Sequence, residues 1–92
     1  MRQIELDGAC LCRREQAMDY LDRRLGLPEW WGRNLDALYD CLTQPGEPTV
    51  LALTRREMVM ESPFGRVLLR VLEDAAEDNP DLWVEDAGGD PG

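Results

Sequence analysis

The first quarter of the chain changes from an alternating to a helical spacing of hydrophobic residues. In residues 3–7, Ile4 and Leu6 alternate with polar residues, which predicts a short strand that ends at Gly8. Residues 14–25 then place hydrophobic side chains at helical spacing, and Gly26 suits the left-handed position that follows a helix. The hydrophobic face of this predicted helix consists of Ala17, Met18, Leu21 and Leu25. Its opposite face carries Glu15, Asp19, Asp22 and Arg23.

The middle of the chain predicts a loop, a second helix and a buried strand. Proline and glycine interrupt residues 27–33, which favours a loop. Asn34 is a good N-cap for a helix that runs to about residue 42, with an inward face of Leu35, Leu38 and Leu42. After a Pro/Gly turn over 44–48, residues 49–54 are almost continuously hydrophobic. That pattern is typical of a strand buried in a parallel sheet.

The last part of the chain predicts two further helices and a final strand. A short helix over 55–60 is followed by Ser62-Pro63, a strong start for a helix that continues to about Asp78. Its expected core face consists of Val67, Leu68, Val71, Leu72 and Ala75. Asn79-Pro80 ends the helix, and residues 82–84 predict a strand.

Strands that alternate with helices imply an α/β fold with a parallel sheet. We expect a small three-stranded parallel sheet covered by about four helices. We expect one domain over residues 1–86, because the chain has only 92 residues. Residues 87–92 have the composition of a flexible C-terminal tail.

The charge balance limits the choice of partner. Ten basic residues, all arginine, face 19 acidic ones, and the net charge is −9. Such a chain repels nucleic acid and anionic membranes and attracts basic partners. No hydrophobic run approaches the roughly 18 residues of a membrane span, and the first residues lack the hydrophobic segment of a signal peptide. We therefore expect a cytoplasmic monomer that binds a basic protein, with neither nucleic acid nor membrane as its partner.

The cysteines do not indicate a metal site or a disulfide framework. Cys10, Cys12 and Cys41 are odd in number, and the chain has no histidine. Reduced thiols are the simplest interpretation, because a tetrahedral zinc site would lack a clear fourth ligand. We expect neither a metal nor another cofactor.

The predicted helix after Asn34 carries the first candidate site. Asp36 and Asp40 lie four residues apart and so share one helix face, opposite the leucines, with Tyr39 beside them. Two carboxylates and a phenol could perform acid–base chemistry. However, the chain has no histidine, no phosphate-binding glycine loop and no recognised nucleophile motif. A plain solvated face is the alternative, because an acid in the first helical turn also stabilises the helix dipole.

A second acidic cluster and a pair of aromatic residues extend this candidate surface. Residues 71–92 contain eight acids and no base, and four of the acids crowd the end of a helix, where they oppose its dipole: Glu73, Asp74, Glu77 and Asp78. A solubilising tail explains them equally well. Trp30 and Trp31 precede the acidic helix, and at least one of them should be partly exposed. Exposed aromatic side chains beside carboxylates are typical of a binding surface.

Residues 25–43, LGLPEWWGRNLDALYDCLT, carry a specific resemblance. Leu-Pro, an acid, two aromatics and a glycine precede Asn-Leu-Asp-Ala-Leu, an aromatic and Asp-Cys-Leu-Thr. This order closely resembles the signature of the barstar family, without a gap. The remainder of the chain agrees in the order and length of its elements and only weakly in identity.

The resemblance implies an intracellular inhibitor that blocks a secreted microbial ribonuclease with its second helix and the preceding loop. It implies enzyme contacts at Trp30, Gly32, Asp36, Tyr39 and Asp40. Asp40 corresponds to the central carboxylate of the family. With a small shift in register, Asp74 and Asp78 correspond to two acids of the last helix.

Several positions depart from the family pattern. Both loop aromatics are tryptophan rather than tyrosine, the helix aromatic is tyrosine rather than tryptophan, and the 44–48 turn is short and has no aromatic. Arg33 replaces an acid and should lie at the rim of the contact surface. Two other hypotheses therefore stay open: a binding module of the same fold for a different basic toxin or enzyme, and an acid–base enzyme that uses Asp36 and Asp40.

Overall fold

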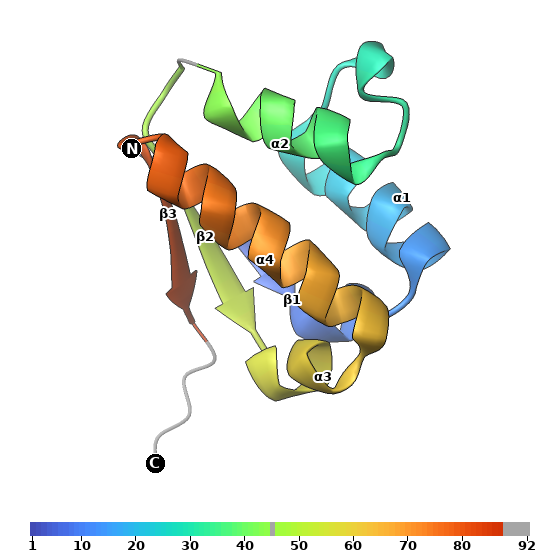
Figure 1. Cartoon of the computed structure of the whole chain (residues 1–92). Coiled ribbons are helices and arrows are strands. Elements are labelled where there is room, and N and C mark those ends of the chain that lie inside the picture. Colours follow the sequence, from blue (N-terminus) through green and yellow to red (C-terminus); the bar gives the residue numbers. More distant parts are fainter. Residues whose placement is uncertain (45, 88–92) are drawn as a thin grey trace.

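Three parallel strands form the centre of the fold (Figure 1). A computed structural model describes residues 1–44 and 46–87 of the chain. The strands are β1 (Arg2–Asp7), β2 (Thr49–Thr54) and β3 (Leu82–Asp86), in the order β1-β2-β3. Ile4 of β1 lies beside Leu51 of β2, which lies beside Val84 of β3. The predicted α/β class and three-stranded parallel sheet are confirmed.

Helical segments connect the strands and pack against one face of the sheet. They are η1 (Gly8–Cys10), α1 (Arg14–Leu25), η2 (Glu29–Trp31), α2 (Leu35–Thr43), α3 (Arg56–Glu61) and α4 (Pro63–Asp78). Helices α2 and α4 lie side by side (Figure 1). The single-turn helix η2 interrupts the loop predicted over 27–33. No helix in the described part of the chain is long and hydrophobic enough to cross a membrane.

The predicted capping residues set the helix boundaries. The Asn34 side chain accepts a hydrogen bond of 2.7 Å from the backbone N–H of Ala37, and Ser62 accepts one of 3.0 Å from Gly65. Each bond satisfies a donor that the first helical turn leaves free. Gly26 ends α1 with a φ of 61°, a left-handed conformation that glycine adopts without steric cost.

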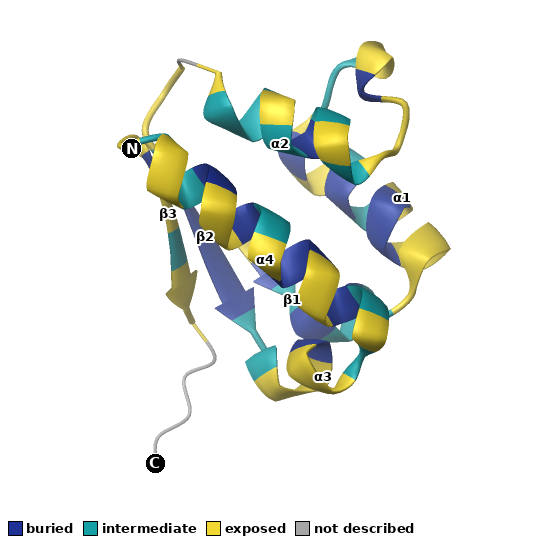
Figure 2. Ribbon diagram, viewed as in Figure 1, coloured by how far each residue is buried: buried dark blue, intermediate teal, exposed yellow. Residues whose placement is uncertain are grey.

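The core lies between one face of the sheet and the helices. Figure 2 shows buried residues on β2 and on the inward sides of α1 and α4. Leu51 and Leu53 belong to this core, whereas Val50 and Ala52 of the same strand are buried outside it. Successive strand residues point to opposite faces. Side chains on both faces of the central strand, which has a neighbouring strand on each side, are therefore buried, in agreement with its continuous run of hydrophobic residues.

One core prediction for α4 is wrong. Val67 is 53% exposed, whereas Leu69, which we did not assign to the core, is only 3% exposed. Glu73 lies one turn after Leu69 and pairs with Arg56 of α3, so this side of α4 faces α3. Packing against α3 rotates the buried face of α4 toward Leu69 and away from Val67.

The end of the domain extends slightly beyond the predicted strand. β3 continues to Asp86, and the N–H of Ala87 donates a hydrogen bond of 2.7 Å to the carbonyl of Leu53. Ala87 is therefore tied to the sheet, although we predicted it as the first residue of the tail. The rest of that predicted tail, residues 88–92, lies outside the described residues.

Candidate partner-binding surface

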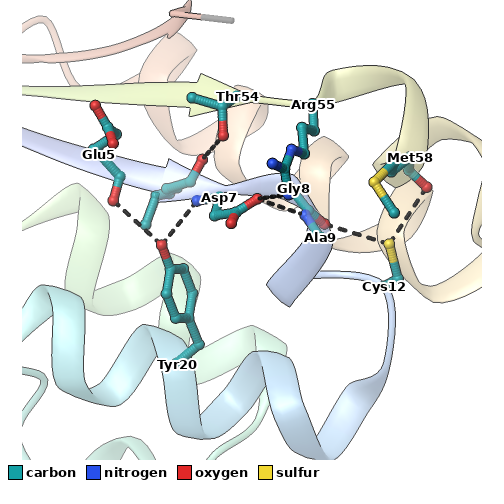
Figure 3. Close-up of polar contacts among 10 residues, drawn as sticks. Glu5, Asp7, Gly8, Ala9, Cys12, Tyr20, Thr54, Arg55 and Met58 are labelled. Carbon is teal, nitrogen blue, oxygen red and sulfur yellow. Dashed lines mark hydrogen bonds and ion pairs between the residues drawn. The ribbon is translucent and has the colours of Figure 1, made fainter.

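The carboxyl ends of β1 and β2 are the first place to look for a site, because ligands of open α/β folds usually bind at this edge. Here β1 ends in Asp7, whose carboxylate accepts a hydrogen bond of 2.9 Å from Ala9 N–H and lies 3.7 Å from Arg55 (Figure 3). The N–H of Asp7 donates to the Tyr20 hydroxyl at 2.8 Å. These polar groups are thus partnered by the chain itself.

Close packing seals the same edge. A Cβ on Gly8 would lie only 2.4 Å from the carbonyl oxygen of Arg55 and 2.5 Å from that of Thr54. The Cys12 thiol donates to the carbonyl oxygens of Gly8, at 3.3 Å, and Met58, at 3.4 Å (Figure 3). We call this region, formed by Asp7, Gly8, Cys12, Tyr20, Thr54 and Arg55, the closed end of the sheet.

Helix α2 presents a different surface. Gly32 and Arg33 both have left-handed backbones, with φ of 57° and 55°, and turn the chain into the helix. Asp36 and Asp40 then lie one turn apart on the exposed side of α2, opposite the buried Leu38. We call Asp36 and Asp40 the acidic face. Its position away from the leucines agrees with the sequence prediction.

The other side chains of α2 pack more closely than the sequence suggested. Tyr39 is half-buried and contacts the core, so it lies at the flank of the acidic face rather than fully on it. Cys41 is also half-buried against the core. Burial, and after it the Asp40 carboxylate, raises the pKa of the Cys41 thiol, because both disfavour a second negative charge.

The end of α4, which carries the second acidic cluster, lies beside the end of α2. The Asn79 side chain, just after α4, donates a hydrogen bond of 2.9 Å to the carbonyl of Leu42 near the end of α2. The C-terminal ends of the two helices therefore lie together. The four acids of α4 named above are all exposed, although Asp74 lies 3.9 Å from Arg70. Carboxylates and two helix C-termini in one place concentrate negative potential.

The loop before α2 contributes one exposed aromatic residue. Trp30 is 57% exposed, and Trp31 is 2% exposed within the core. This confirms that one tryptophan of the pair faces solvent. The guanidinium of Arg33 lies 2.5 Å from the Asp19 carboxylate of α1. Arg33 is therefore held toward α1, an interaction that sequence spacing alone did not indicate.

We did not predict two features of this region from the sequence. Asp19 and Asp22 were assigned to the solvated face of α1, yet Asp19 binds Arg33, and Asp22 lines a groove with Glu29. The available signal was their i, i+3 spacing, which places both acids on one side of α1. Among the described residues, no group of three or more histidine, cysteine or acidic side chains could hold a metal ion.

A comparison with known proteins assigns the chain to a family. The family model described as Barstar (barnase inhibitor) matches residues 1–87. The chain belongs to the barstar family. It is also 36% identical, over 84 residues, to a Bacillus subtilis (strain 168) protein named "Putative ribonuclease inhibitor YrdF", a match that covers 88% of this chain and 92% of that protein.

Membership of the barstar family indicates a role for the chain. At family level, the role of the chain is that of a barnase-type ribonuclease inhibitor. Trp30 lies in η2, Gly32 and Arg33 follow it, and Asp36, Tyr39 and Asp40 lie on α2, which contacts η2. It places the end of α4, which carries Asp74 and Asp78, next to the end of α2.

Proposed function

We propose that this barstar-family protein inhibits a secreted microbial ribonuclease by placing the acidic face of α2 and the preceding loop into the enzyme's active site. One observation carries the proposal. Asp36 and Asp40 lie one turn apart on the exposed side of α2, and within residues 1–44 and 46–87 neither carboxylate has an ion-pair partner. Both carboxylates are therefore available to an external cation.

The chemistry of the target supports this choice. A site that cleaves RNA needs cationic side chains directed at phosphate. Carboxylates on a helix offer such groups charge-assisted hydrogen bonds, which are stronger than neutral ones and can be bidentate with arginine. The net charge of −9 also accelerates the encounter with a basic enzyme. The acidic face thus occupies positions that RNA phosphates would take.

Each residue of the surface has a distinct role in this proposal. Asp40 is the central carboxylate, and Asp36 supports it one turn earlier. Trp30 supplies an exposed aromatic anchor of the kind found at interface hot spots. Gly32 lets the enzyme approach the backbone, because it has no side chain. The remaining contacts are Tyr39 at the flank, Arg33 at the rim, and Asp74 and Asp78 on α4.

The protein acts by binding rather than by catalysis in this proposal. It is a cytoplasmic monomer that protects the producing cell from its own enzyme, as an immunity protein does. No metal, cofactor, nucleic acid or membrane takes part.

RNA cleavage assays with a panel of guanyl-type microbial ribonucleases, barnase included, test the function. Increasing amounts of the protein are added to a fixed amount of each enzyme, up to micromolar excess. We expect activity to fall linearly and to reach its minimum at one inhibitor per enzyme for at least one member of the panel. Undiminished cleavage throughout the panel would contradict a ribonuclease target and leave a binding module for another basic protein as the alternative.

A further inference from the structure

A groove of about 410 Å³ lies between α1 and the loop that leads to α2. Asp22 comes from α1, and the other lining residues come from the loop: Leu27, Glu29, Trp31, Gly32 and Arg33. Leu27 gives the groove a hydrophobic wall, Trp31 borders it but is only 2% exposed, and Asp22 and Glu29 add carboxylates. Such a groove suits a side chain that is apolar along its length and cationic at its tip, as lysine and arginine are.

The ion pair between Arg33 and Asp19 neutralises the basic side chain that lines this groove. Arg33 is its only basic lining residue, and its guanidinium is bound by Asp19 on α1. Within the part of the chain that the structure describes, neither Asp22 nor Glu29 has an ion-pair partner. Among the described residues, the groove therefore keeps two carboxylates that form no ion pair with an arginine of the protein.

We propose that this groove receives a lysine or arginine side chain of the bound ribonuclease, which makes Asp22 and Glu29 specificity-determining residues outside the acidic face. The inference rests on the proposed function. The side chain comes from the same enzyme, because Gly32 and Arg33 line the groove and also belong to the proposed contact surface. The aliphatic part of the side chain lies along Leu27, and its cation binds the two carboxylates.

Dissociation rates of matched double variants test the groove. Asp22→Asn with Glu29→Gln removes both groove charges, and Glu15→Gln with Glu57→Gln removes two exposed charges elsewhere. Neither control acid is ion-paired within the described residues, and both variants have the same net charge. The probe is the ribonuclease that the wild-type protein inhibits. We expect it to leave the groove variant about tenfold faster and the control within about twofold of wild type.

The outcomes separate the groove from the function. If the ribonuclease dissociates at the same rate from the groove variant and its control, the groove does not receive a side chain of the enzyme. The proposed inhibition still stands in that case if Asp40→Ala loses binding. If the wild-type protein binds no enzyme of the panel, both the proposed function and the proposed role of the groove are wrong. Circular dichroism of both double variants ensures that faster dissociation does not result from unfolding. A perturbed Trp31 indole N–H signal in the NMR spectrum of the complex, retained in the control and weakened in the groove variant, provides further support.

Discussion

The closed end of the sheet and the acidic face of α2 use similar side chains in opposite ways. At the closed end, Asp7 accepts a backbone hydrogen bond and pairs with Arg55, and the N–H of Asp7 is bound by Tyr20. On α2, Asp36 and Asp40 project from an exposed helix surface without an ion-pair partner in the described residues. The first region satisfies its polar groups internally, and the second leaves its carboxylates exposed.

This difference separates the part of the fold whose polar groups bind one another from the part whose carboxylates stay exposed. Ligands of open α/β sheets usually bind at the carboxyl ends of the strands. In this protein, η1 and α3 occupy the carboxyl ends of β1 and β2, and the Gly8 backbone packs against the carbonyls of Thr54 and Arg55. The proposed recognition surface lies instead on the helical layer. A change on the acidic face should therefore affect binding alone, and a change at the closed end should affect stability alone.

Asp40→Ala should have the largest effect, a loss of binding without a loss of stability. Removal of one partner of a buried charge pair costs about 2–5 kcal/mol or more, a range that includes measurements on the barnase–barstar complex itself. Calorimetry with the inhibited ribonuclease measures the affinity. Glu57→Ala, which removes an exposed acid of α3, is the control for net charge. A loss below tenfold for a folded Asp40→Ala variant would contradict the central role of Asp40.

Gly8→Ala should have the converse effect at the closed end. The new Cβ would lie 2.4 Å from one carbonyl oxygen and 2.5 Å from another, so the backbone must move. We expect the free energy of unfolding to fall by about 3 kcal/mol. Urea unfolding measures this change. Gly46→Ala is the matched control, because among the described residues, its chain neighbours aside, no atom lies within 4 Å of its added Cβ. A stable Gly8→Ala variant would show that the closed end is not tightly packed.

Arg33→Gln should have a smaller effect, on the rate of association. The substitution removes a cation from the proposed rim of the surface and releases Asp19. We expect association with a basic ribonuclease to accelerate about twofold at low salt and less at physiological salt, because screening weakens long-range attraction. Stopped-flow measurements compare it with Arg23→Gln, an exposed arginine of α1 that gives the same net charge. Equal rates for the two variants would place Arg33 outside the encounter surface.

Cys41 should produce the smallest effect, a pH dependence of stability. Burial and Asp40 raise the pKa of its thiol above the ordinary value of 9.0. The unfolded chain therefore releases this proton first as the pH rises. The stabilising contribution is complete below pH 9.0 and is lost as the pH rises from there through the pKa of the folded state.

Urea unfolding at several pH values around and above 9.0 tests this contribution. Wild type should lose stability with rising pH more steeply than Cys41→Ala, because alanine has no proton to release. All other side chains are the same in both proteins, so their contributions cancel in the comparison. Parallel profiles would show that the Cys41 thiol is not coupled to folding.

Local sequence patterns predicted most secondary structure, because the relevant interactions lie within one or two helical turns. The helix over 14–25 and its Gly26 cap, the strand over 49–54, and the start at Ser62 all have the predicted bounds. Capping bonds and hydrophobic periodicity connect residues close in the chain. The exposed position of Asp36 and Asp40 follows from the same periodicity, because the leucines of α2 fix which side faces the core.

Tertiary packing decided the rest. Which tryptophan of the 30–31 pair is buried depends on how η2 meets the core, and Leu69 rather than Val67 is buried because α3 packs against that side of α4. Asp19 binds Arg33 from 14 positions away in sequence, across the loop that connects α1 to α2. The groove at Asp22 exists only because this loop folds back beside α1. The sequence by itself therefore determined the elements and the residues able to bind a cation. The tertiary structure determined which of those charges are already neutralised, because a contact between distant segments exists only once the chain has folded.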